Sequence, residues 1–199
     1  MTWCGRKWAV SGMAGSDTRN IKAAPASAGR VLAATDTSRP WFRLSDGDTM
    51  TELIRRGAVA DVASITALTR AAYAKWVPLI GREPFPMKVD YFAAISKHRF
   101  DLLLVNSDLA ALIETMLRDE DLLIENVAVA PDFQKQGFGR ALIAHAEQVA
   151  AQAGRAHVRL YTNSCFEENL RLYASLGYDV EREEALNGGI AVHMVKHIA

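Results

Sequence analysis

The sequence contains few cysteines, no long apolar run and no excess of charge of either sign. Its two cysteines, Cys4 and Cys165, lie far apart without the spacing of metal ligands, which argues against a disulfide framework and a bound metal. No segment reaches the roughly 20 apolar residues that cross a bilayer, and no region near the N-terminus has the apolar centre of a secretory signal. The 23 basic and 23 acidic residues indicate neither a nucleic-acid nor a membrane partner. We therefore expect a soluble, cytoplasmic protein.

The first 49 residues differ in composition from the rest of the chain. They are rich in Ala, Ser, Gly and Thr, carry scattered arginines and show no apolar periodicity. We expect residues 1–49 to form a largely disordered leader or extension. Regular patterning begins near Met50, and we assign residues 50–199 to one domain with a two-layer core.

Apolar periodicity predicts alternating helices and strands in residues 50–199. A helical stripe covers 60–74, with Asp61 at its start as a cap or first-turn acid. Three prolines and a glycine argue against regular structure at 75–87, a segment that either plugs one end of the core or forms a lid over a substrate pocket. Ser164 and Glu167 have the form of a capping box. Strands are expected at 53–56, 100–105, 110–117, 122–130, 157–162, 178–183 and 190–196, and further helices at 89–97, 140–153 and 164–176. This order predicts an α/β domain with a mixed sheet and helices on both faces.

A glycine-containing loop lies between the strand at 122–130 and the helix at 140–153. Two glycines one residue apart, Gly137 and Gly139, let the backbone turn tightly and bring its N–H groups close to a ligand. The first turn of the following helix adds unpaired N–H groups, and Lys135 and Arg140 add positive charge. By itself the pattern is also typical of an ordinary strand-to-helix turn. Its context favours a pyrophosphate site.

Several motifs in the same order resemble the GNAT superfamily of acyl-CoA-dependent N-acyltransferases. They are the run Ile124-Glu125-Asn126-Val127-Ala128-Val129-Ala130-Pro131, the loop Gln134-x-x-Gly137-x-Gly139, Asn169, and Leu172-Tyr173-x-x-Leu176-Gly177-Tyr178. The resemblance extends from about Met50 to the C-terminus and implies a mixed, mostly antiparallel central sheet flanked by helices. The stretch 80–91 also looks like a bacterial GNAT subgroup of unnamed substrate.

The resemblance implies acetyl-CoA as cosubstrate. The backbone of Val127 and Val129 would pair with its pantetheine arm, and Asn169 would contact that arm. The pyrophosphate would be held by the loop residues Gln134, Lys135, Gln136, Gly137, Phe138, Gly139 and Arg140. One position departs from the family pattern: the usual asparagine, seven residues before the tyrosine, is Phe166 here, so Asn163 or Asn169 would take over its role.

Acetyl transfer to an amine needs a base and an acid. An amine with a pKa of about 10.4 is neutral in only about one molecule in 2,500 at pH 7. Glu125 is the best candidate for the base or for a water relay, and Glu114 on the preceding strand is a second carboxylate; partnership of Glu125 with Arg159 is the alternative. Tyr173 resembles the family's general acid for the thiolate, and its alternative role is to fill the core.

The other reactive side chains are less convincing candidates. His145 is expected to be solvated, and His193 and His197 belong to a surface or subunit contact. Cys165 has no His or Asp partner in local sequence, so direct transfer is favoured over an acyl-enzyme.

The motifs predict acetyl transfer from acetyl-CoA to a primary amine of a small molecule or a protein. A non-catalytic acyl-CoA-binding or sensing module is the alternative, and a nucleotide-phosphate site is disfavoured because no Gly-Lys-Ser/Thr ending follows. For the acceptor, Trp76, Phe85 and Tyr91 suggest apolar walls, and Glu83 or Asp90 is available to attract an amine. The family resemblance also suggests a homodimer formed through the last strands.

Overall fold

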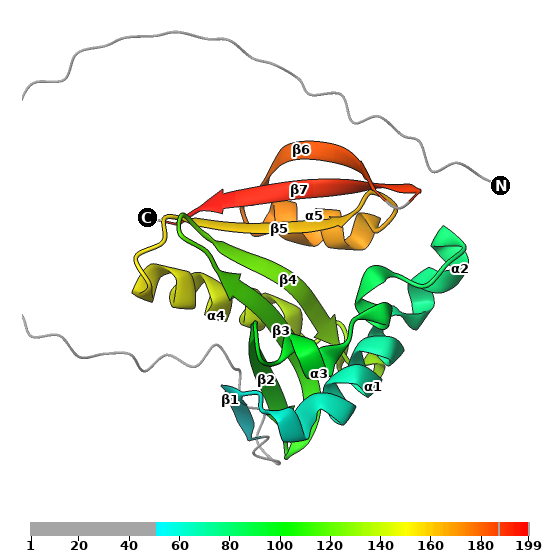
Figure 1. The fold of residues 1–199 in the computed structure, drawn as a ribbon, viewed down its shortest axis with the longest axis vertical. Coiled ribbons are helices and arrows are strands. Elements are labelled where there is room, and N and C mark those ends of the chain that lie inside the picture. Colours follow the sequence, from blue (N-terminus) through cyan, green and yellow to red (C-terminus); the bar gives the residue numbers. More distant parts are fainter. Residues whose placement is uncertain (1–50, 187, 199) are drawn as a thin grey trace, which may run out of the picture. The chain divides into compact units, whose positions relative to one another are not determined.

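The computed structural model describes residues 51–186 and 188–198. The expectation for residues 1–49 lies outside this range. The described residues form one twisted sheet with helices packed against it (Figure 1). No helix in these residues is long and apolar enough to cross a membrane.

Seven strands form the sheet, in the order β1-β2-β3-β4-β5-β7-β6. Neighbouring strands are antiparallel except β4 and β5, which are parallel. The strands are β1 (Glu52–Arg56), β2 (Arg99–Val105), β3 (Asp108–Leu117), β4 (Leu122–Val129), β5 (His157–Asn163), β6 (Asp179–Leu186) and β7 (Gly189–His197). The predicted mixed, mostly antiparallel sheet is therefore confirmed.

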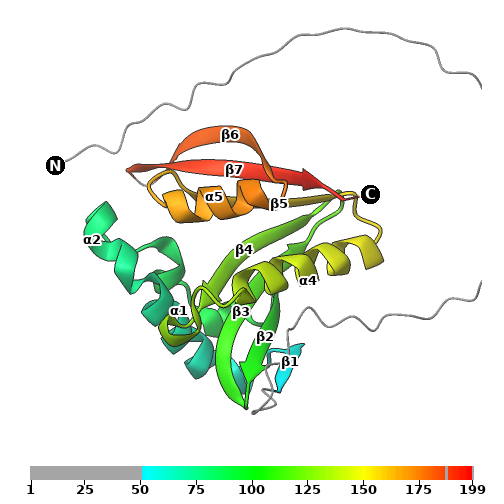
Figure 2. The same ribbon diagram turned by 180° about the vertical axis from the view of Figure 1, so that it is seen from behind.

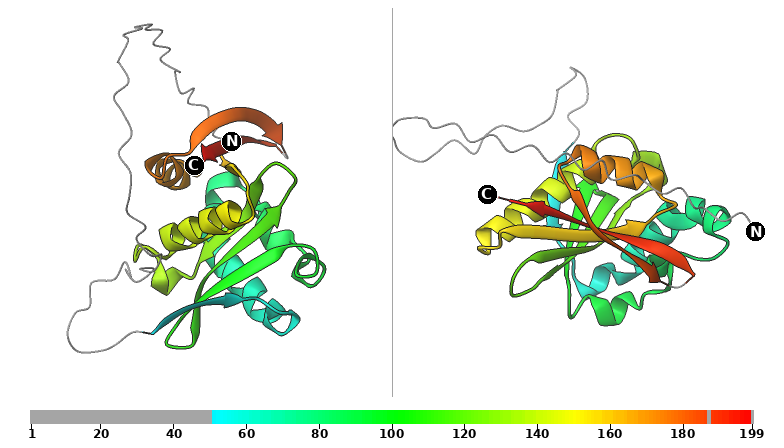
Figure 3. Two further views of the ribbon diagram at one scale, coloured as in Figure 1. Left: turned by 90° about the vertical axis from the view of Figure 1, so that its left-hand side faces the viewer. Right: turned by 90° about the horizontal axis from the view of Figure 1, so that it is seen from above.

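Helices cover both faces of the sheet. The α-helices are α1 (Val62–Tyr73), α2 (Val77–Ile80), α3 (Tyr91–Ala94), α4 (Phe138–Gln152) and α5 (Glu167–Ser175). Short 3₁₀ turns lie at Val59–Asp61, Ala74–Trp76, Phe85–Lys88 and Pro131–Phe133. Figure 3 shows α1 and α4 on opposite faces of the strands, and Figure 2 shows α4 from the other side.

Two apolar clusters form the core, one on each face. On the first face, Ile65 and Leu68 of α1 pack with Leu112 of β3. On the second, Leu142 and Ile143 of α4 pack in a cluster that reaches β5 and β7. The i, i+3 spacing in α1 therefore buries the stripe that the sequence predicted.

A β-bulge interrupts β4 and opens the sheet next to β5. Glu114 of β3 pairs with Asn126, whereas the next residue, Thr115, pairs with Ile124, so Glu125 is the extra residue. The parallel pairing of β4 with β5 ends at the same place, with Ile124 and Leu160 as its last pair. Beyond this point the two strands diverge, as Figure 1 shows. Beyond the bulge, the edge of β4 that faces β5 therefore has no strand partner among the described residues.

Two local expectations were wrong. The segment 75–87 contains helical turns despite its prolines, because Pro78 occupies the first turn of α2, where the missing N–H costs nothing. The capping box at Ser164 is absent, because the residue before α5 is Phe166. The expectation for Asp61 is confirmed as a first-turn acid, since it ends the 3₁₀ turn that leads into α1 and its Oδ2 accepts the Ala58 N–H at 2.9 Å. Its Oδ1 also lies 2.7 Å from Arg55 Nη2.

Candidate active site

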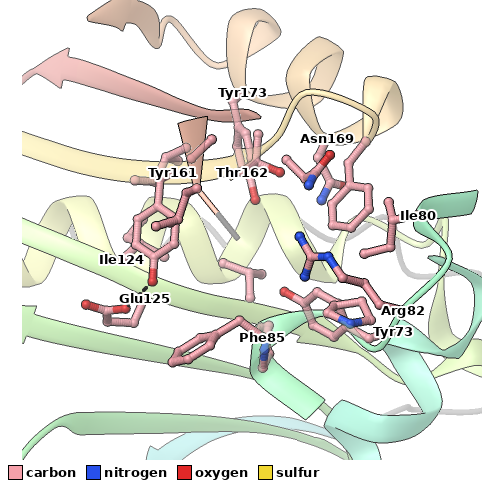
Figure 4. A pocket seen from close by; sticks show the side chains of 18 residues that line it. Tyr73, Ile80, Arg82, Phe85, Ile124, Glu125, Tyr161, Thr162, Asn169 and Tyr173 are labelled. Carbon is pink, nitrogen blue, oxygen red and sulfur yellow. Dashed lines mark hydrogen bonds between the residues drawn. The ribbon is translucent and has the colours of Figure 1, made fainter. Parts of the chain in front are cut away.

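Two cavities meet where β4 and β5 diverge. The first, here called the Glu125 cavity, has a volume of about 110 Å³ and is lined by Tyr73, Ile80, Arg82, Pro84, Phe85, Pro86, Ile124, Glu125, Val127, Leu160, Tyr161, Thr162, Asn163, Phe166, Asn169, Tyr173, Leu186 and Ala191 (Figure 4). The second, the glycine-loop cavity, has a volume of about 370 Å³ and is lined by Ala72, Tyr73, Lys75, Trp76, Val127, Ala128, Val129, Phe133, Gln134, Lys135, Gly137, Phe138, Gly139, Arg140, Ile143, Glu168, Asn169, Leu172 and Tyr173. They share Tyr73, Val127, Asn169 and Tyr173. A ligand that spans both would pass these four residues.

The glycine loop forms the N-terminus of α4. Gly137 precedes the helix with a φ of 95°, a left-handed conformation that glycine adopts without strain. Lys135 also has a positive φ, of 64°. The unpaired N–H groups of a 15-residue helix begin here, beside the cavity, and favour an anion. The loop therefore has the geometry of a phosphate site.

Six of the seven predicted loop residues line the glycine-loop cavity: Gln134, Lys135, Gly137, Phe138, Gly139 and Arg140. Gln136 does not, and its side-chain amide donates to the carbonyl of Asp132 at 3.0 Å. Phe138 is only 2% exposed and belongs to the core, so its side chain offers little to a ligand.

The free edge of β4 presents backbone groups to the cavities. Ala130 N–H bonds to Ala110 across the pair with β3, and alternation along an antiparallel strand then points the N–H and C=O groups of Val127 and Val129 away from β3. Gln134 Nε2 donates to the Val129 carbonyl at 3.0 Å, which agrees with this direction. An extended ligand arm could pair here as an added strand.

Tyr173 lies at the junction of the two cavities. It projects from α5, is 8% exposed and packs near Tyr178, with ring centroids 6.2 Å apart. Burial raises the pKa of its hydroxyl to about 12, so the proton is retained at neutral pH. Among the described residues the hydroxyl has no hydrogen-bond partner. The ring belongs to the core cluster on the second face, so the expected alternative of filling the core holds for the ring, while the hydroxyl is available to a ligand in the cavities.

Glu125 faces the first cavity and is held by Tyr161. The Tyr161 hydroxyl of β5 donates to Glu125 Oε2 at 2.6 Å, as the dashed line in Figure 4 marks. The expected alternative partner, Arg159, binds Asp121 and Glu181 instead. The bulge explains this placement, because the extra residue turns the carboxylate towards the opening between the strands.

The comparisons with known proteins agree with this geometry. A family model described as the acetyltransferase (GNAT) family matches residues 66–178, more than half of the chain. The chain belongs to the GNAT acetyltransferase family. The resemblance drawn from the sequence motifs is thereby confirmed.

The GNAT relatives include one curated enzyme with moderate identity. The [ribosomal protein bS18]-alanine N-acetyltransferase of Escherichia coli K12 is 32% identical over 97 residues, which are 48% of this chain and 66% of that enzyme. The match thus spans slightly less than two thirds of the relative's length.

Solved GNAT structures share the fold. PaiA N-acetyltransferase from Thermoplasma acidophilum, in complex with coenzyme A, aligns with a TM-score of 0.65 at 18% identity, over 75% of this chain and 100% of that chain. The E. coli ribosomal-protein-S18-alanine N-acetyltransferase aligns with a TM-score of 0.63 at 22% identity, over 75% and 95% of the two chains.

The asparagines of this GNAT domain occupy different places. Asn169 lines both cavities, whereas Asn163 lines only the Glu125 cavity. Asn163 Oδ1 accepts the Cys165 N–H at 2.9 Å, and the position of the family's usual asparagine is filled by the buried ring of Phe166. That ring stacks on Trp76, with centroids 4.3 Å apart. Asn169 is therefore better placed than Asn163 to take over the asparagine contact to a cofactor in the glycine-loop cavity.

Glu114 is less suited than Glu125 to act on a ligand. It is 4% exposed, lines neither cavity and lies 2.5 Å from His98 Nδ1. Burial raises the pKa of Glu114, although His98 opposes that shift. Next to it, Asn126 Oδ1 accepts the Tyr73 hydroxyl at 2.9 Å, and its amide donates to Tyr91 at 3.2 Å. This polar group ties α1 and α3 to β4.

The acceptor-binding residues predicted from sequence are only partly in place. Phe85 lines the Glu125 cavity, Trp76 lines the glycine-loop cavity, and Tyr91 lines neither. Glu83 pairs with Arg70 at 2.8 Å, and Asp90 caps α3, so neither carboxylate faces the site.

Tyr73, Arg82 and Tyr161 were missed as site residues. No local pattern marks them, because they come together only when 73–86 folds over the opening between β4 and β5.

The histidines lie away from the junction of the cavities. His145 was expected to be solvated, but Nε2 lies 3.3 Å from Asp101 Oδ2 and its side chain is 25% exposed. His193 pairs with Glu184 at 3.2 Å, and His197 packs edge-on against His157.

Proposed function

We propose that this protein transfers an acetyl group from acetyl-CoA directly to a primary amine. The observation that carries the proposal is the junction of the two cavities at Val127 and Tyr173. The glycine-loop cavity fits the phosphates and the pantetheine arm, and the Glu125 cavity supplies a carboxylate for the amine. Membership of the GNAT family supports acetyl-CoA as the cosubstrate.

The residues of the junction divide the chemistry between them. Glu125, directly or through a water molecule, takes a proton from the acceptor ammonium and leaves a neutral nitrogen. Backbone N–H groups at the free edge of β4 polarise the thioester carbonyl, whose carbon the nitrogen attacks. Tyr173 donates its proton to the sulfur as the carbon–sulfur bond breaks, and the second proton that the attacking nitrogen loses, directly or through water, restores the Tyr173 hydroxyl. The products are the N-acetylated amine and the free thiol, and acetyl-CoA supplies only the activated acyl group.

The relatives suggest two broad classes of acceptor amine. The E. coli relative is named for an alanine of ribosomal protein bS18, so an amine of a protein is one acceptor class for this chain. A small-molecule amine is the other. Cytoplasmic location and pairing of two copies through the last strands stay predictions.

The test is a thiol-release assay on the full-length protein with acetyl-CoA and a panel of amines and peptides. Mass spectrometry of the acceptor distinguishes N-acetylation from simple thioester hydrolysis. We expect amine-dependent release and an acceptor heavier by one acetyl group. Binding of acetyl-CoA without any acetylated product would instead identify a non-catalytic acyl-CoA-binding module.

A further inference from the structure

The Glu125 cavity contains a second charged side chain, Arg82. Arg82 and Glu125 are the only charged residues among the described residues that line this cavity. Figure 4 shows Arg82 and Glu125 on opposite sides of the cavity, with the Glu125 carboxylate beside the Tyr161 hydroxyl. The cavity therefore has one positive and one negative end.

Arg82 has no acidic partner among the described residues. The adjacent carboxylate, Glu83, is bound by Arg70 at 2.8 Å, and Arg70 also donates to the carbonyl of Met87 at 3.0 Å. The segment before Arg82 is fixed by Gly81, which ends α2 with a φ of 70°. An arginine that lines a cavity and is not paired with a carboxylate is available to bind an anion.

Asn163 adds a second donor beside Arg82. Its Oδ1 accepts the Cys165 N–H at 2.9 Å, and its Nδ2 amide has no hydrogen-bond partner among residues 51–186 and 188–198. A Cβ placed on Gly189 would lie 3.0 Å from Asn163 Nδ2 and 3.5 Å from Arg82 Nη2. The two donors thus converge at the start of β7, where the absence of a side chain on Gly189 lets both approach the backbone.

We propose that Arg82 and Asn163 bind a carboxylate of the acceptor, while Glu125 receives its amine. The acceptor class is then a free amino acid or a related small molecule with both groups, an inference that rests on the proposed acetyl transfer. One guanidinium matches the single charge of a carboxylate, whereas a phosphate with a charge of about −1.5 to −2 calls for more positive charge. A cavity of about 110 Å³ also suits a small acceptor.

The test compares amino acids with their carboxamides, which keep the amine and lose the carboxylate. Both are titrated into the full-length protein saturated with coenzyme A, and both are then assayed for acetylation. The panel varies the separation of amine and carboxylate from α- to ω-amino acids. We expect at least one amino acid to bind about 10- to 100-fold more tightly than its amide.

Two variants locate the preference. Arg82→Gln should remove the preference for the carboxylate, because it weakens binding of the amino acid and leaves the affinity for the amide within about twofold of wild type. Asn163→Asp keeps an oxygen for Cys165 N–H but opposes a carboxylate, so it should weaken the amino acid at least as strongly. Lys88→Gln removes an exposed positive charge from the same segment, at a residue that lines neither cavity. This control variant should change neither the affinity for the amino acid nor that for its amide.

Three results would overturn the proposal. The first is that the wild type binds every amino acid and its amide with equal affinity. The second is that Arg82→Gln loses affinity for the amino acid and for the amide equally. The third is that Arg82→Gln loses affinity for acetyl-CoA. Binding that prefers the carboxylate without any acetylation would support the carboxylate site and refute the proposed transfer, so the two failures are distinguishable.

Discussion

Replacing Tyr173 with phenylalanine removes one hydroxyl and keeps the ring. The ring is 8% exposed and packs near Tyr178, and the hydroxyl has no hydrogen-bond partner among the described residues. Loss of the hydroxyl therefore breaks no hydrogen bond within the described part of the chain, and the free energy of unfolding should change by less than about 1 kcal/mol. General acid catalysis contributes roughly 10²- to 10⁴-fold, so turnover should fall at least about 100-fold. Acetyl-CoA affinity should stay within about twofold.

The assay measures thiol release, acetyl-CoA binding and urea unfolding on the same preparations. Tyr178→Phe is the matched control, because it removes a hydroxyl that donates to Glu147 at 3.1 Å and lies outside both cavities. That variant should lose stability and keep turnover. Because burial raises the pKa of Tyr173 to about 12, wild-type turnover should show no alkaline loss from this group below about pH 10. Turnover of Tyr173→Phe within threefold of wild type would refute the general-acid role.

Two further predictions concern the loop and a buried carboxylate. Gly137→Ala should lower the free energy of unfolding by about 1–2 kcal/mol, because the φ of Gly137 is 95°. Gly139→Ala is the control: its new Cβ would make only an ordinary van der Waals contact, so the free energy of unfolding should stay within about 0.5 kcal/mol of wild type. Equal urea midpoints for the two variants would contradict this prediction. Asp121→Asn should cost about 2–3 kcal/mol, since Asp121 is 3% exposed and binds Arg118 and Arg159. Although burial opposes its charge, these arginines hold the pKa of Asp121 below its ordinary value of 3.8. Wild type should therefore lose this stabilisation as the pH falls below 3.8, and a variant with the same urea midpoints and the same pH dependence would contradict the assignment.

The order of elements was predictable because each has a local signal. Each signal depends on residues that are close together in the sequence. Examples are the apolar stripe of α1, the turn between β2 and β3, and Gly154 after α4, which has a φ of 70°. The glycine loop was found for the same reason, since its geometry belongs to a strand followed directly by a helix.

The acceptor side was not predictable, because its residues meet only in the tertiary structure. The bulge at Glu125 depends on the register between β3 and β4, which the alternation of apolar residues does not reveal. Tyr161 reaches Glu125 across the two diverging strands, and Arg82 arrives from the segment after α2. The predicted cap at Ser164 was wrong because the chain still turns there: Asn163 Oδ1 accepts the Cys165 N–H, and α5 begins only after Phe166.

The most direct test of the account is a calorimetric titration of acetyl-CoA into the full-length protein, with ADP and ATP as controls. The account predicts micromolar binding of acetyl-CoA and none of ATP, because the free edge of β4 and the glycine loop together fit a pantetheine arm and a pyrophosphate. Absence of acetyl-CoA binding would reduce the glycine loop to a strand-to-helix turn and contradict the proposed acetyl transfer.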